Sequence, residues 1–212
     1  MKRKHPIETL IAQGEHQQLD FKFEVNDCRK IARTLSAFAN TDGGRLLIGV
    51  KDNGHITGVQ GDEEYYMIEA AVRLYTKPCV PFSARRWDVN GRSVLEVCVP
   101  SSADRPHLAP CRDGVYCAYI RVADENMPAD EVLLLSWKKQ SNPAGTLLKL
   151  SRPVEKLLRY LDTHPSIHIT QFCRLAHIRH ATARNILSDL VAIGSLRYVI
   201  GEHGIRYERS PS

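Results

Sequence analysis

The sequence has no run of 18 apolar residues, which a helix needs to cross a bilayer. The N-terminal stretch Met1–Pro6 is basic but leads into no apolar segment, so it does not look like a secretory signal. These two absences exclude a membrane-spanning protein and lead us to expect a cytoplasmic one.

Recognisable cofactor and nucleophile motifs are also missing. The six cysteines form no C-x-x-C pair and no zinc-ligand spacing, and we interpret them as free thiols that act as small buried hydrophobes. No Gly-x-x-x-x-Gly-Lys-Ser/Thr sequence is present, so nothing supports an ATPase. No Gly-x-Ser-x-Gly sequence is present either. We therefore predict no cofactor, apart from a metal ion in one alternative given below.

What the sequence does have is an uneven distribution of charge. From Lys138 to Ser212 there are twelve Lys and Arg against five Asp and Glu, a net charge of +7, which leaves −2 for residues 1–137. A basic C-terminal third predicts a polyanionic partner for that part of the chain. The length of 212 residues is comfortable for two domains.

The first domain is predicted over residues 1–140 as a mixture of helices and strands. Apolar residues at helical spacing predict helices over 7–12, 28–39, 63–74 and from Pro128 to about 139. Strands are predicted over 19–23, 46–50, 82–89, 92–99 and 115–122, and Asn90-Gly91 is typical of a hairpin turn. The paired Gly43 and Gly44 are expected to supply positive φ. The fold class is therefore α+β with a mixed sheet.

A linker and a small second domain follow. Breaker and polar residues gather in 141–152, which we predict to be the linker. Residues 153–212 then show a helix ending before Pro165, a helix over 169–176 that Thr170 could cap, a helix over 181–193, and strands over 196–200 and 205–208. This order of elements predicts a winged helix-turn-helix.

In that fold the third helix enters the major groove of DNA. The predicted base-contacting residues lie opposite the apolar stripe of this helix and include Arg184 and Asn185. Arg can pair with guanine, and Asn with adenine, through two hydrogen bonds. Ser188 is expected to be exposed on the same side of the helix. Cations of the hairpin are expected to contact phosphate. The predicted nucleic-acid-binding residues are Arg179, His180, Thr182, Arg184, Asn185, Arg197, His203 and Arg206.

Three stretches of the first domain, Gly14–Lys22, Ser36–Gly44 and Leu47–Gly54, together resemble the Schlafen AlbA-like family. Gly58-Val59, Arg105-Pro106-His107 and Tyr119–Val122 add to this resemblance, which covers roughly residues 8–138. It implies nucleic-acid binding and, as in some members, metal-dependent RNA cleavage.

The catalytic set implied by the resemblance is Glu15, Asp20 and Asp52 as ligands of Mg²⁺ or Mn²⁺, with Lys22 beside them. Converging carboxylates can hold such an ion and activate a water for attack on phosphate. Asp20 stands where the family has the longer glutamate, and the family's third acid could belong at Lys51 rather than Asp52. The alternative is that these carboxylates are surface charges or structural hydrogen-bonding groups.

Two hypotheses follow. The first is a DNA-binding transcriptional regulator, expected to be a homodimer, with duplex DNA as its partner. The alternative is a metal-dependent endoribonuclease that uses Glu15, Asp20 and Asp52. A third interpretation is an interaction module without nucleic acid, which would bind its partner with little dependence on salt.

Overall fold

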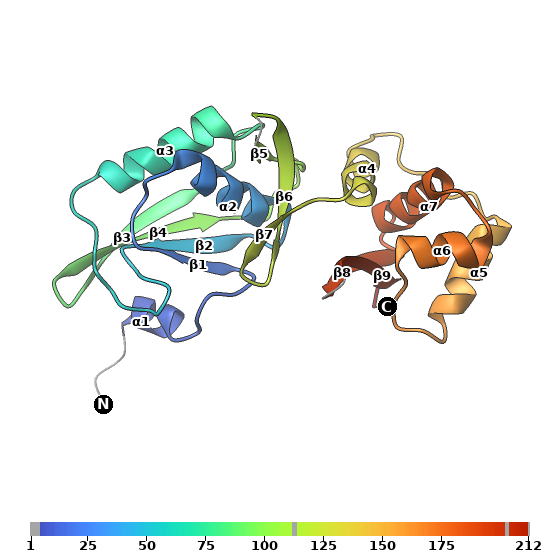
Figure 1. The fold of residues 1–212 in the computed structure, drawn as a ribbon. Coiled ribbons are helices and arrows are strands. Elements are labelled where there is room, and N and C mark those ends of the chain that lie inside the picture. The colour runs from blue at the N-terminus through green and yellow to red at the C-terminus, as the bar shows by residue number, and fades with distance from the viewer. Residues whose placement is uncertain (1–4, 112–113, 202–203, 212) are drawn as a thin grey trace. The chain divides into compact units, whose positions relative to one another are not determined.

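The computed structural model describes residues 5–111, 114–201 and 204–211. The chain forms two compact units, Met1–Ala129 and Asp130–Ser212 (Figure 1). Among the described residues, no helix is long and apolar enough to span a membrane.

The first unit is built on a four-stranded mixed sheet, as predicted. Its strand order is β1-β2-β4-β3; β1 runs parallel to β2, and the other pairs are antiparallel. The strands are β1 (Leu19–Lys22), β2 (Gly44–Ile48), β3 (Ser83–Val89) and β4 (Arg92–Val99). The apolar strand β2 lies between β1 and β4, in the central position that its composition predicts.

Helices cover the two faces of this sheet unequally. On one face, α2 (Cys28–Asn40) and α3 (Glu63–Tyr75) pack against the main core, whereas α1 (Pro6–Ile11) lies on the opposite face (Figure 1). A second sheet of β5 (Leu108–Pro110), β6 (Tyr116–Val122) and β7 (Glu125–Pro128) packs beside α2. Pro128, which we expected to begin a helix, ends β7 instead.

The two glycines at the start of β2, Gly43 just before it and Gly44 as its first residue, serve different purposes. Gly43 has φ +74°, and a Cβ there would lie 2.8 Å from the backbone nitrogen of Ser101. Gly44 does not have positive φ; its hydrogen leaves room for the Phe38 ring, which a Cβ would approach to 2.4 Å. Our expectation of positive φ therefore holds for the first glycine only, and the second is needed for close packing.

The second unit contains four helices and a hairpin: α4 (Glu131–Gln140), α5 (Arg152–Leu161), α6 (Ile169–Ala176), α7 (His180–Ala192), β8 (Leu196–Gly201) and β9 (Gly204–Arg209). The two strands pair antiparallel. One apolar cluster, which includes Leu157, Phe172, Leu187 and Tyr207, joins the helices to the hairpin. The side chain that caps α6 is His168, which accepts from the backbone of Thr170, and not Thr170 itself.

The division between the units differs from the predicted one, since α4 packs with the second unit. Val132 belongs to the core of that unit. Asp130 caps α4 through the backbone nitrogen of Leu133 at 2.8 Å, and its other carboxylate oxygen accepts from the buried Tyr207 hydroxyl at 2.9 Å. The predicted linker 141–152 thus connects two helices of the same unit.

All six cysteines are free. Cys98 and Cys117 lie in β4 and β6 and are half-buried, whereas Cys79 is exposed, so the expectation of burial is wrong for that residue.

Candidate nucleic-acid interface

The connection between α6 and α7 is short and well defined. His177 ends α6 in the left-handed conformation, with φ 55°, and Arg179 precedes the first residue of α7. The left-handed residue turns the chain sharply, so that only three residues separate α6 from α7. The unit therefore presents two helices, joined by a tight turn, ahead of the hairpin.

Four of the predicted nucleic-acid-binding residues lie exposed at the beginning of α7. They are Arg179, His180, Thr182 and Asn185. The apolar residues of α7, such as Leu187 and Leu190, are fully buried on its other side. The amphipathic pattern of α7 thus assigns His180, Thr182 and Asn185 to the solvent side correctly, and Arg179 is exposed in the turn just before the helix.

The flank of α7 that contains Arg184 is occupied by α4. The Arg184 guanidinium is half-buried and forms an ion pair with Glu131, the first residue of α4. Lys139, near the other end of α4, lies 2.6 Å from an Asp189 carboxylate oxygen and donates to the Ser188 hydroxyl at 2.7 Å. Ser188 is fully buried, so the expectation that it faces solvent is wrong.

The cations of the hairpin are partly engaged within the unit. Arg197 is exposed and pairs with Glu208 across the two strands, whose register brings these residues opposite each other. The Arg206 Nε atom donates to the Ser166 hydroxyl at 2.8 Å. His203 lies outside the described residues. Arg209, which the sequence analysis missed, is half exposed beside Asp162 at 2.6 Å.

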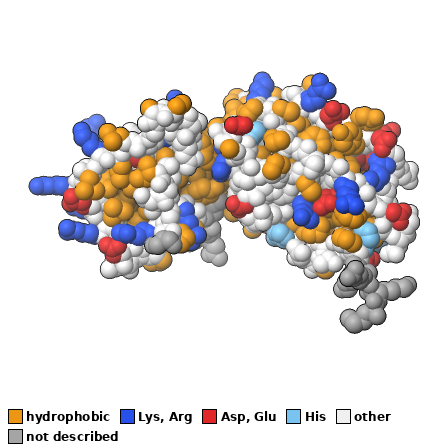
Figure 2. Space-filling view, turned by 180° about the vertical axis from the view of Figure 1, so that it is seen from behind, with side chains coloured by type: hydrophobic (Ala, Val, Ile, Leu, Met, Phe, Trp, Pro, Cys, Tyr) orange, Lys and Arg blue, Asp and Glu red, His pale blue; other side chains and the backbone are white. Residues whose placement is uncertain are grey.

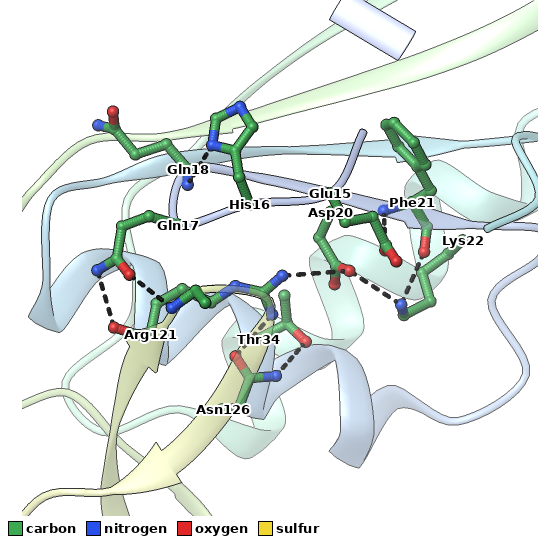
Figure 3. Close-up of polar contacts among 11 residues, drawn as sticks. Glu15, His16, Gln17, Gln18, Asp20, Phe21, Lys22, Thr34, Arg121 and Asn126 are labelled. Atoms are coloured by element: carbon green, nitrogen blue, oxygen red, sulfur yellow. Dashed lines mark hydrogen bonds and ion pairs between the residues drawn. The ribbon is translucent and has the colours of Figure 1, made fainter. Parts of the chain in front are cut away.

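In the first unit, Glu15, Asp20 and Lys22 belong to a compact polar network (Figure 3). A Glu15 oxygen accepts from the backbone nitrogen of Phe21 at 2.8 Å. Asp20 is 3% exposed, and its Oδ1 atom lies 3.2 Å from the Lys22 ammonium and 3.4 Å from the Arg121 guanidinium. Two cations therefore neutralise the Asp20 carboxylate.

Arg121 is the residue of this network whose part the sequence analysis did not find. It is 1% exposed, on β6, and it donates to Asn126 at 3.1 Å. Asn126 in turn donates to the Thr34 hydroxyl at 2.9 Å. Asp20 thus balances the charge of a buried arginine, a structural task that a buried guanidinium requires.

Burial, together with a hydrogen bond with Asp20, raises the pKa of Glu15 from 4.5 to about 7. A carboxyl group with this pKa is partly protonated near neutral pH, which suits a hydrogen bond between neighbouring acids but weakens a cation ligand. Asp52 is exposed in the turn after β2. Within the part of the chain that the structure describes, no three His, Cys, Asp or Glu side chains are placed to hold a metal ion.

A cleft of about 860 Å³ lies beside this network. Asp20, Lys22 and Arg121 line it, whereas Glu15 and Asp52 are not among its lining residues. The four residues that the resemblance assigned to catalysis are therefore not gathered in one cavity. The Asp20 carboxylate, already paired with two cations, does not fit a site for Mg²⁺ or Mn²⁺ in this arrangement.

Comparison with known proteins gives one matching family model and several similar solved structures. The family model described as Schlafen, AlbA_2 matches residues 15–130. No curated protein matches. The DIP2311 protein from Corynebacterium diphtheriae is similar with a TM-score of 0.46 and 19% identity over 74% of this chain, which spans 38% of the length of that protein. The N-terminal domain of a RecG-related protein from Nitrosomonas europaea has a TM-score of 0.42 and 19% identity, over 60% of this chain and 96% of that one.

Proposed function

The chain belongs to the Schlafen AlbA_2 family, and from this premise we propose that it is a DNA-binding transcriptional regulator whose second unit is a winged helix-turn-helix. Family membership supports a function related to nucleic acid. The choice of duplex DNA rests on the second unit, which has twelve Lys and Arg against seven Asp and Glu and so accounts for the whole +5 of the chain.

The observation that carries the proposal is the exposed polar surface at the beginning of α7. A recognition helix reads bases with its first turns, and Arg179, His180, Thr182 and Asn185 occupy those turns. Asn185 is suited to adenine and Arg179 to phosphate. The four side chains need no rearrangement of the core to meet DNA, because the core lies on the other side of α7.

Arg184 and the hairpin cations have a conditional part in this proposal. On DNA, Arg184 would exchange Glu131 for a phosphate or a guanine, and Arg197 would exchange Glu208 for a phosphate. A homodimer would bring two copies of α7 to half-sites about one helical turn apart.

The alternative function, a metal-dependent endoribonuclease, has less support. Its three carboxylates would have to converge on one ion. Instead, Asp20 is paired with Arg121 and Lys22, and the cleft beside Asp20 is lined by neither Glu15 nor Asp52. We therefore assign Glu15 and Asp20 a structural role in the first unit.

Binding of a fluorescent duplex DNA of random sequence, followed by anisotropy between about 50 and 200 mM salt, tests the proposal. Arg179→Ala should weaken binding and reduce the slope of log K against log salt by about one. Arg159→Ala is the matched control, because Arg159 is also exposed but lies on α5. Equal effects of the two substitutions, or binding without salt dependence, would contradict the proposal.

A further inference from the structure

On the face of the main sheet opposite α2 and α3, α1 covers only part of the surface. Its residues follow from strand register: Leu19, Arg45, Cys98 and Ser83 form one row across the four strands. The next row contains Phe21, Leu47, Glu96 and Arg85, and Trp87 follows on β3. Together with α1, the leucines and Phe21 form a small apolar core. The half of the face that consists of Arg45, Ser83, Arg85, Trp87, Glu96 and Cys98 is called the open face below.

A buried carboxylate organises the open face. Glu96 is only 6% exposed, although its neighbours on the same face reach solvent. One of its oxygens accepts from the Trp87 indole nitrogen at 2.7 Å, and the other lies 3.3 Å from the Arg45 guanidinium. Because Glu96 holds both side chains, Trp87 and Arg45 are fixed in position before any ligand arrives.

The Arg85 guanidinium lies on Trp87, with its Cζ atom 3.8 Å from the centre of the ring. His5 meets the same ring edge-on, with the ring centroids 5.4 Å apart. Arg85 is exposed and forms no ion pair with any residue that the structure describes. A planar cation that is already stacked on one side presents its other side as a platform for a further planar group.

A groove of about 760 Å³ adjoins the open face. From the sheet it is lined by Arg45, Ser83 and Cys98, from α1 by Leu10, and from the loop after α1 by polar side chains that include His16 and Gln18. One carboxylate, Asp42, also lines the groove and accepts a hydrogen bond from Gln17. Figure 2 shows Lys and Arg side chains beside hydrophobic ones on the surface of the first unit.

We propose that the open face and this groove bind single-stranded nucleic acid, with an unpaired base stacked on Arg85 and a neighbouring phosphate held by Arg45. Single strands are recognised by this combination, since every base has a flat face to stack and the backbone needs cations. Among the described residues of the open face, the one anion, Glu96, is paired with Arg45, so the face has a net charge of +1 and Arg85 is its unpaired cation. The site lies wholly within the first unit and is separate from the duplex-binding surface proposed for α7.

The test is the affinity of the full chain for a fluorescent oligothymidylate of about ten nucleotides, with an oligouridylate of the same length to distinguish DNA from RNA. Arg85→Gln is expected to weaken binding about fivefold or more, through lost stacking and charge. Arg86→Gln is the matched control: Arg86 is the next residue of β3, points to the opposite face and pairs with Asp62 at 2.8 Å. It should change affinity by less than about twofold.

A second comparison separates this inference from the proposed duplex binding. Arg179→Ala should leave oligothymidylate binding unchanged, and Arg85→Gln should leave duplex binding unchanged. The inference is overturned if the wild-type protein does not bind either single strand, or if Arg85→Gln and Arg86→Gln weaken binding equally. It is also overturned if Arg179→Ala removes single-strand binding, because the site would then lie in the second unit.

Discussion

The ion pair between Glu131 and Arg184 predicts that Glu131→Gln binds duplex DNA more tightly than the wild-type protein. The two side chains are 69% and 34% exposed, and a pair so exposed contributes about 0.2–1 kcal/mol. Glutamine at position 131 releases the Arg184 guanidinium from this ion pair, so that it can bind DNA, and removes a negative charge beside α7. At about 1.4 kcal/mol per tenfold, the gain corresponds to about 1.4-fold to fivefold in Kd, and the salt slope should steepen by up to about one.

The matched control for this prediction is Asp162→Asn. Asp162 also pairs with an arginine of the second unit, Arg209 at 2.6 Å, and is 56% exposed, so the change in charge and the lost pair are comparable. Asp162 follows the last residue of α5, and its partner Arg209 belongs to the hairpin rather than to α7. Anisotropy titrations with the same duplex should show tighter binding for Glu131→Gln only. Weaker binding by Glu131→Gln, or an equal gain in both variants, would refute the reasoning.

Two further predictions concern stability. Tyr207→Phe should lower the free energy of unfolding by about 1.5–3 kcal/mol, because a buried hydroxyl that donates to the Asp130 carboxylate is removed. Urea unfolding measures this difference. As a control, Tyr160→Phe, which removes an exposed hydroxyl, should lower the free energy of unfolding by under about 1 kcal/mol. Glu15, whose pKa rises from 4.5 to about 7 on folding, stabilises the protein fully below pH 4.5, and that stability is lost as pH rises to about 7. The free energy of unfolding should therefore fall between pH 5 and pH 7.5, and after allowance for solvent screening at this half-buried side chain the fall should be about 1–2 kcal/mol larger in the wild type than in Glu15→Gln. Identical pH dependence of stability in the two proteins would contradict the raised pKa of Glu15.

Local pattern was enough to predict most elements of the fold. The apolar stripe of residues 28–39 and the Asn90-Gly91 turn each gave a helix or hairpin within a residue or two of its observed bounds. The strands β5 and β7 were missed, because they have only three and four residues and no clear alternation.

Tertiary relations were less accessible. The domain boundary was predicted at the breaker residues of 141–152, which placed α4 in the first domain. The structure instead buries Val132 of α4 in the core of the second unit, a relation that local composition does not show. Ser188 was expected on the solvent side of α7, because the spacing of the apolar residues of α7 alone would put it there. In the structure, Lys139 of α4 contacts the Ser188 hydroxyl.

The site residues show the same limit. The solvent side of α7 follows from helical spacing, and the exposed Asn185 agrees with it. The partner of Asp20 could not be predicted, because Arg121 comes from a strand far along the chain and reaches Asp20 only through the packing of β6 beside α2. The carboxylate that the family resemblance suggested as a metal ligand pairs with Lys22 and Arg121 in the structure.

The most direct test of the proposed function is a paired assay of binding and cleavage on the purified full chain. Duplex DNA and a structured RNA are each incubated with the wild type, Asn185→Ala and Glu15→Ala, in Mn²⁺ and in EDTA. We predict salt-sensitive duplex binding without cleavage, weakened in Asn185→Ala and retained in Glu15→Ala. RNA cleavage that requires Mn²⁺ and disappears in Glu15→Ala would contradict the account and establish a nuclease instead.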